Sequence, residues 1–111
     1  MKSFNLTIKQ IMNRSFRDIN GFEIPKNDEQ EVKKSKGSPI YGEINYQALN
    51  KLLDYLALSS KDVFYDLGSG VGKVILQTAL YTKVKKAIGI ELSKSRYRKI
   101  NWLFKTRYNN W

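Results

Sequence analysis

Residues 63–72 read VFYDLGSGVG, and this stretch decides the fold. A short run of mostly apolar and aromatic residues holds one acid, Asp66, and three glycines then follow at alternate positions. This order is typical of a buried parallel strand that passes into a helix around a bound nucleotide-like cofactor. Glycine lets the backbone approach a ligand where a Cβ atom would collide. The stretch therefore predicts a strand over residues 63–67, a ligand-binding loop over residues 68–72, and then a helix.

The same alternation of strand and helix continues downstream. The helix after the loop is predicted to end near Tyr81, and residues 87–90, AIGI, indicate a second strand that ends at Glu91. Another helix is predicted from about Ser95. Residues 44–58 carry an apolar stripe at helical spacing and predict an amphipathic helix before the first strand. The class is therefore α/β, with parallel strands joined by a right-handed crossover and buried on both faces.

The N-terminal third is predicted to be organised differently. Residues 1–25 are expected to be mostly helical, after a short strand indicated by alternating Phe4, Leu6 and Ile8. Residues 26–38 are polar and charged and predict a mobile linker. Order is expected to resume at residue 39.

Composition excludes several classes of protein. The chain has 111 residues, which limits it to one small domain, and it contains no cysteine and no histidine. Cysteine-based metal sites, disulfides and histidine-based triads are therefore excluded. No apolar run reaches the roughly 20 residues that span a bilayer, and no secretory signal is visible, so we expect an intracellular protein without a membrane partner.

The charge is strongly basic. The net charge is +10, and from Lys73 onward Glu91 is the single acid. Such a surface favours polyanionic partners such as nucleic acid or nucleoprotein. A solvated, lysine-rich surface without any such partner explains the same composition equally well.

Spacing separates three chemistries of glycine loops. A phosphate-binding loop needs its first glycine where Leu67 stands and a hydroxyl where Val74 stands, so it does not fit. A dinucleotide fingerprint places Lys73 at its third small position, which disfavours an oxidoreductase. The spacing from Asp66 to Gly72 is instead Asp-x-Gly-x-Gly-x-Gly.

That pattern resembles motif I of the class I S-adenosylmethionine-dependent methyltransferases. Asp66 is suited to the ammonium group of the cofactor, and amides at the helix N-terminus are suited to its carboxylate. Glu91 ends the next strand, where an acid can accept both ribose hydroxyls, and Leu92 is placed to lie against the adenine. As alternatives, Asp66 and Glu91 could be a helix-capping acid and a solvated strand end.

A closer resemblance includes residues upstream of the loop. Tyr41-Gly42-Glu43, a helix, and then Asp-Leu-Gly-Ser-Gly-Val-Gly are similar to the core of the DOT-type (disruptor of telomeric silencing) histone-lysine methyltransferases and their prokaryotic relatives. The resemblance covers roughly residues 38–98 and implies that Tyr41 and Glu43 contact the methionine part of the cofactor. The family usually has threonine and glutamine where this chain has Ile44 and Lys73. Without the resemblance, Tyr41-Gly42-Glu43 would be an ordinary turn before a helix.

The resemblance implies a Rossmann-like class I methyltransferase fold, of which residues 39–111 would form the N-terminal, cofactor-binding half. We expect S-adenosyl-L-methionine as cofactor and a protein lysine as acceptor, with a location in the cytoplasm of a prokaryote or the nucleus of a eukaryote. The family's acceptor pocket follows a fourth strand, so no catalytic residue is assigned and we expect a truncated chain. It would be a fragment or the product of a truncated gene, or a partner chain or self-association would complete the sheet. A catalytically inactive basic module that binds nucleic acid or protein is the alternative. The predicted cofactor-binding residues are Tyr41, Gly42, Glu43, Asp66, Leu67, Gly68, Ser69, Gly70, Val71, Gly72, Lys73, Glu91 and Leu92.

Overall fold

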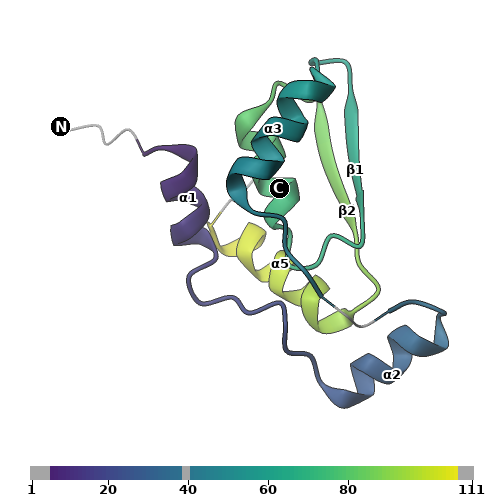
Figure 1. The fold of residues 1–111 in the computed structure, drawn as a ribbon. Helices are drawn as coiled ribbons and strands as arrows, with labels where there is room; N and C mark the ends of the chain where they lie inside the picture. The colour runs from purple at the N-terminus through teal and green to yellow at the C-terminus, as the bar shows by residue number, and fades with distance from the viewer. Residues whose placement is uncertain (1–5, 39–40, 108–111) are drawn as a thin grey trace.

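Two parallel strands and the helix that joins them form the centre of the computed structural model (Figure 1). The structure describes residues 6–38 and 41–107, with side chains as far as Trp102. Strand β1 (Val63–Leu67) pairs with β2 (Lys86–Ile90), with Val63 opposite Lys86 and Leu67 opposite Ile90. Helix α4 (Lys73–Tyr81) connects them and packs against β2, and α5 (Lys94–Arg107) follows. The described part of the chain is thus α/β.

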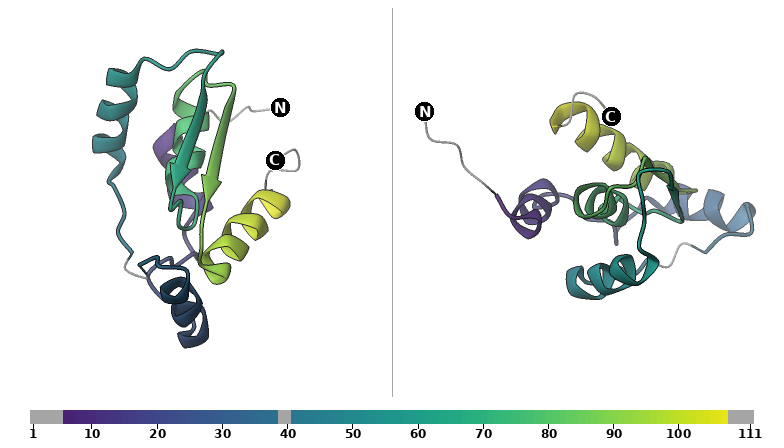
Figure 2. Two further views of the ribbon diagram at one scale, coloured as in Figure 1. Left: turned by 90° about the vertical axis from the view of Figure 1, so that its right-hand side faces the viewer. Right: turned by 90° about the horizontal axis from the view of Figure 1, so that it is seen from above.

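Three more helices precede the strands. Helices α1 (Ile8–Ser15) and α3 (Tyr46–Leu56) both pack against α4, as the two views of Figure 2 show. Helix α2 (Lys26–Lys34) lies at the carboxyl ends of the strands, beside the start of α5 (Figure 1). The end of the sheet where parallel α/β proteins bind ligands is therefore flanked by α2 and α5.

Local sequence explains where α1 and α3 begin and where α3 ends. Thr7 and Gln10 form a reciprocal capping box at the start of α1. The side chain of Asn45 accepts a hydrogen bond from the Ala48 amide at the start of α3. Helix α3 ends at Ala57, which adopts the left-handed conformation with φ +48°. Polar side chains thus satisfy amides at both N-termini that have no partner within the helix.

The main hydrophobic cluster joins α1 to the glycine loop. It contains Met12 from α1, Phe16 at the C-cap of that helix, Val71 from the loop, Leu76 from α4 and Ile100 from α5. Each of these side chains is buried. Helix α1 therefore belongs to the same core as the strand–helix unit.

The strands and α4 confirm the sequence-based boundaries, but their expected burial on both faces is wrong. Val63, Tyr65 and Leu67 are exposed, Leu67 by 77%, whereas Phe64 and Asp66 are half-buried. Among the described elements α4 packs against β2, and the alternate side chains of β1 remain in solvent. Period-two exposure of this kind is expected of a sheet that is covered on one face.

Two expectations for the N-terminal third are also corrected. Leu6 and Thr7 are not in a strand and Ile8 begins α1, while Phe4 lies outside the described residues. The linker expected over residues 26–38 contains helix α2, whose Asp28 and Val32 are buried. Helix α2 is polar except for Val32, so it lacks the apolar stripe by which an amphipathic helix is recognised in a sequence. The local sequence features that indicate a helix here are Pro25 at the N-cap, acids in the first turn and lysines in the last turn.

Candidate functional site

The glycine loop takes a backbone path that other residues rarely adopt. Gly68, Gly70 and Gly72 have φ values of +86°, +58° and +91°. The amides of Gly68 and Ser69 both donate to the carbonyl oxygen of Ile90, at 2.7 and 3.0 Å. These bonds hold the loop against the end of β2, and α4 starts directly after Gly72.

Tyr41 packs directly on this loop. A Cβ atom at Gly70 would lie 2.5 Å from Cε2 of Tyr41, and one at Gly21 would lie 2.5 Å from Cζ and from the hydroxyl oxygen of the same residue. The Arg96 guanidinium lies 4.6 Å from the ring centroid, and the Phe22 ring meets it edge-on at 4.8 Å. Burial, reinforced by the nearby Glu43 carboxylate, raises the pKa of Tyr41 to about 12. At Gly70, the space left by the missing side chain is therefore filled by Tyr41 rather than by open solvent.

Two adjoining pockets lie on either side of Tyr41, Gly42 and Gly68. One pocket, of about 390 Å³, has Leu67, Glu91 and Leu92 in its wall. The other, of about 190 Å³, is lined by Asp66, Ser69, Lys73 and residues of the 41–44 segment. Ten of the predicted cofactor-binding residues line one pocket or both. The other three, Gly70, Val71 and Gly72, line neither pocket. Val71 packs in the hydrophobic cluster, and the Gly72 amide donates to the Ser69 carbonyl oxygen within the loop.

The two predicted carboxylates have different surroundings. Glu91 Oε1 accepts a hydrogen bond from the Gly70 amide and Oε2 accepts one from the Ser93 amide, each at 2.8 Å. A carboxylate has about four acceptor positions, so roughly two stay open for a ligand. The Asp66 carboxylate accepts no hydrogen bond from any described residue, and burial, followed by repulsion from Glu91, raises the pKa of this carboxyl group. Asp66 is therefore a half-buried anion for which the described structure supplies no donor.

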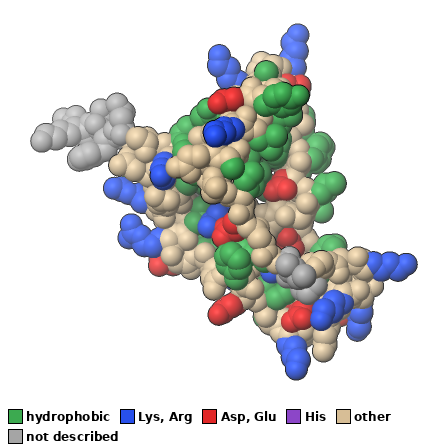
Figure 3. All heavy atoms as spheres, viewed as in Figure 1, with side chains coloured by type: hydrophobic (Ala, Val, Ile, Leu, Met, Phe, Trp, Pro, Cys, Tyr) green, Lys and Arg blue, Asp and Glu red, His purple; other side chains and the backbone are tan. Residues whose placement is uncertain are grey.

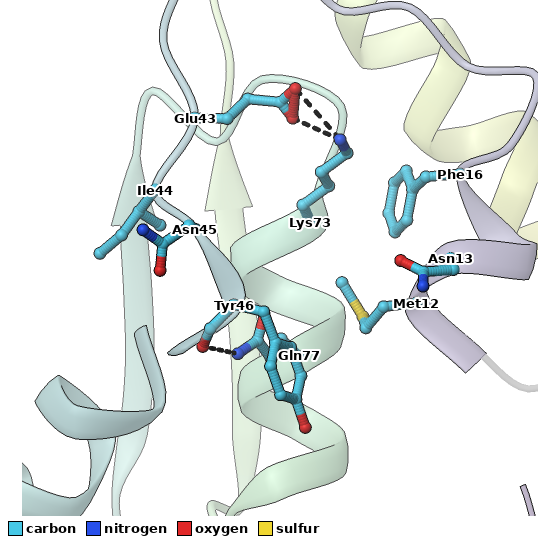
Figure 4. Close-up of a pocket in the computed structure, with 9 residues that line it drawn as sticks. All are labelled: Met12, Asn13, Phe16, Glu43, Ile44, Asn45, Tyr46, Lys73 and Gln77. Atoms are coloured by element: carbon cyan, nitrogen blue, oxygen red, sulfur yellow. Dashed lines mark hydrogen bonds and ion pairs between the residues drawn. The ribbon is translucent and has the colours of Figure 1, made fainter. Parts of the chain in front are cut away.

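Two residues that line the smaller pocket, Glu43 and Lys73, form an ion pair. Lys73 Nζ lies 3.1 Å from Glu43 Oε1 and also contacts the second carboxylate oxygen. Figure 4 shows this pair beside a third cavity, of about 410 Å³, that is also lined by Met12 and Asn13 of α1 and by Phe16 at its C-cap. The lysine Nζ is 5.7 Å from the Phe16 ring centroid. Residues of α1 thus line the same cavity as Glu43 and Lys73.

Several residues that line the pockets were not predicted from the sequence. They are Val32 and Arg96 in the larger pocket, and Met12, Asn13, Phe16 and Gln77 around the third cavity. These residues come from helices that flank the loop, and no local motif marks them. Buried Gln77 gave the clearest available signal, since a polar residue within an apolar helix face must find partners. Its side-chain amide donates to Tyr46 O and Asn50 Oδ1.

The described residues contain no group of acids that could hold a metal ion, and none of their helices is long and apolar enough to cross a membrane. Paired parallel strands, a glycine loop before a helix, and two acids at the strand ends define an α/β protein with a candidate nucleotide-type ligand groove.

Comparison with known families gives this class a specific identity. The family model described as "Histone methylation protein DOT1" matches residues 22–110, which is most of the chain. The chain therefore belongs to the DOT1 histone methylation protein family.

Individual relatives agree with this assignment. The chain is 49% identical over 61 residues to the H3 lysine-79 specific histone-lysine N-methyltransferase of Caenorhabditis elegans, and 46% identical over 52 residues to the one of Drosophila melanogaster. It is also 36% identical over 52 residues to a protein-lysine N-methyltransferase of Saccharolobus islandicus. The matches cover 55%, 47% and 47% of this chain, and 6%, 3% and 32% of the relatives. The chain thus corresponds to a part of each relative.

Proposed function

We propose that this chain forms the S-adenosylmethionine-binding part of a protein-lysine methyltransferase with a Rossmann-like fold. The observation that carries the proposal is the paired groove around Gly68, with Asp66 in one pocket and Glu91 in the other. Membership of the DOT1 family and the names of the relatives support the methyl-transfer class and a protein-lysine acceptor. The same membership supports an intracellular site of action.

The two pockets suit the two ends of this cofactor. In the proposal, Leu92 and the open acceptor positions of Glu91 take the adenine and ribose in the larger pocket. Asp66 takes the ammonium group in the smaller pocket, because its carboxylate has no donor among the described residues. Tyr41 and Gly42 lie between the two pockets and would cover the middle of the cofactor.

Lys73 changes the charge beside the smaller pocket, where the methionine part of the cofactor would lie. Its ammonium group is paired with Glu43, so the two charges largely cancel beside the smaller pocket. When bound, the cofactor would supply a sulfonium methyl group that an uncharged lysine amine can attack. The residues of this chain would hold that cofactor in a fixed orientation, which is the main protein contribution to such a transfer.

Calorimetric titration with S-adenosylmethionine and with S-adenosylhomocysteine tests the proposal. We expect saturable binding of both ligands, weakened at least roughly tenfold in Asp66→Asn, because the charged contact to the ammonium group is lost. Asp18→Asn makes the same chemical change at an exposed position and should bind as the unchanged chain does.

Absence of cofactor binding, or equal binding by Asp66→Asn, would overturn the proposal. DNA binding that weakens steeply with salt, without any response to the cofactor, would instead favour a basic binding module.

A further inference from the structure

A chain of hydrogen bonds runs from helix α2 to the glycine loop. Asp28 Oδ2 accepts from the Ser93 hydroxyl at 2.5 Å and from the Ser95 amide at 3.1 Å, and Asp28 Oδ1 accepts from the Lys94 amide at 3.0 Å. The Ser93 amide donates to Glu91, which in turn accepts from the Gly70 amide. Six residues on three separate segments of the sequence are thereby joined.

The burial of this chain makes its geometry specific. Asp28 is 6% exposed and Ser93 is fully buried. A buried carboxylate is stable when several donors satisfy it, and a helix N-terminus has amides without partners inside the helix. Asp28 meets both requirements at once, since it caps α5 from a helix that lies more than sixty residues earlier. Ser93 is held between Asp28 and the Arg96 amide, which donates to the Ser93 hydroxyl at 3.3 Å.

The position of Ser93 determines where Glu91 can lie. Only Leu92 separates the two residues, and the Ser93 amide binds one oxygen of the Glu91 carboxylate. The other oxygen is held by Gly70. If Ser93 moves, Glu91 loses one of its two fixed contacts and its open acceptor positions are no longer aimed into the larger pocket.

We propose that Asp28 is a positioning residue for the cofactor site, which it acts on through Ser93 and Glu91. This inference rests on the proposed function for its ligand, but the hydrogen-bond chain itself does not. Helix α2 then does more than cover the site, because its acid sets the orientation of the acid that would accept the ribose hydroxyls.

Two readouts on the full chain test the proposal. In the first, amide resonances of the unliganded, ¹⁵N-labelled chain are compared for Asp28→Asn, Ser93→Ala and Glu31→Gln. Glu31 is an exposed acid on the same helix, so Glu31→Gln makes the same charge change away from α5. We expect the Gly70 amide to shift in both Asp28→Asn and Ser93→Ala, and the Ser93 amide to shift in Asp28→Asn. Both amides should stay unchanged in Glu31→Gln.

The second readout is a double-mutant cycle on the binding of S-adenosylhomocysteine and of adenosine, both of which carry the ribose. Asp28→Asn should weaken both ligands roughly tenfold. In a Glu91→Gln background the same change should have little further effect, because the two residues act through one contact. A full, additive loss in that background would mean that Asp28 only stabilises the fold, and would overturn the proposal. An unmoved Gly70 amide would overturn it as well, even if the chain bound neither ligand and the proposed function had failed.

Discussion

Single residues of the glycine loop have separate tasks, although the sequence presents them as one motif. Gly68 borders both pockets, and a Cβ atom there would meet no atom within 4 Å. Gly70 packs against the Tyr41 ring, and its amide donates a hydrogen bond to the Glu91 carboxylate. The motif thus provides a ligand-facing glycine and a packing glycine, and the two respond differently to substitution.

Gly70→Ala should destabilise the chain and displace Tyr41. The new Cβ would lie 2.5 Å from Tyr41 Cε2, and φ +58° costs an alanine about 1–2 kcal/mol before any collision is counted. We expect a loss of about 2–4 kcal/mol in the free energy of unfolding, measured with urea. Gly42→Ala is the control, because a Cβ there meets nothing within 4 Å, and it should change stability by less than about 0.5 kcal/mol. Equal effects of the two variants would contradict the packing described for Tyr41.

Asp66→Asn should stabilise the unliganded chain. Because the pKa of Asp66 is raised by burial and by Glu91, the folded state disfavours its ionised form, and near pH 7 this lowers the stability of the fold. Asparagine removes the charge and the penalty, so the urea midpoint near neutral pH should rise. The same variant should bind the cofactor poorly. A lower midpoint would indicate that the Asp66 charge contributes to folding rather than to a ligand site.

Asp28 should make stability dependent on acid pH. Burial of Asp28 opposes ionisation, but the hydrogen bonds from Ser93, Ser95 and Lys94 outweigh it and hold its pKa below the ordinary value of 3.8. A lowered folded-state pKa means that the stabilisation is complete above pH 3.8 and is lost as the pH falls through the folded-state value. In urea unfolding near pH 7, the free energy of unfolding of the unchanged chain should be about 2 kcal/mol higher than that of Asp28→Asn. This difference should shrink below pH 3.8, and a constant difference would contradict the assignment.

At the scale of elements, periodic segments were predictable and polar ones were not. Strands β1 and β2 and helices α3 and α4 have apolar patterns that the local sequence shows directly, and their bounds agree within a few residues. Helix α2 has one buried apolar side chain, Val32, and its place is determined by Asp28, whose partners are far away in the sequence. No local pattern specifies a partner at that separation, so α2 was expected to be a linker.

The end of α3 offers a test at this scale. Ala57 adopts φ +48°, where glycine is favoured. Ala57→Gly should raise the free energy of unfolding by about 0.5 kcal/mol, because the relief of left-handed strain exceeds the added entropy of the unfolded chain. Ala48→Gly, inside the same helix, should lower it by about 1 kcal/mol. Thermal unfolding followed by circular dichroism measures both, and effects of the same sign would contradict the assigned end of α3.

At the scale of the whole molecule, apolar side chains remain on the surface around the sheet. Val63, Tyr65 and Leu67 of β1, Ile90 of β2 and Leu52, Tyr55 and Leu56 of α3 are all exposed by more than 40%. Figure 3 shows hydrophobic side chains grouped over the part of the molecule that contains α3 and the strands, with lysine and arginine side chains around them. An apolar surface of this kind favours association.

Sedimentation velocity over a range of concentrations tests this surface. We expect the unchanged chain to show a sedimentation coefficient that rises with concentration. Tyr65→Glu places a charge on β1 and should reduce that rise, because a charge on an exposed strand opposes pairing. Tyr97→Glu is the matched control on α5, where the tyrosine is 52% exposed compared with 59% for Tyr65. An equal reduction in both variants would point to net charge rather than to the sheet surface.

The sequence by itself determined the strands, the glycine loop and the acids Asp66 and Glu91, because these features depend on residues that are neighbours along the chain. It also pointed to the family, through Tyr41-Gly42-Glu43 placed before that loop. Tertiary structure alone decided that Tyr41 packs on Gly70, that Lys73 pairs with Glu43, and that Asp28 caps α5. Each of these contacts joins residues about thirty or more positions apart, and such pairings depend on how the elements pack in space rather than on any local pattern.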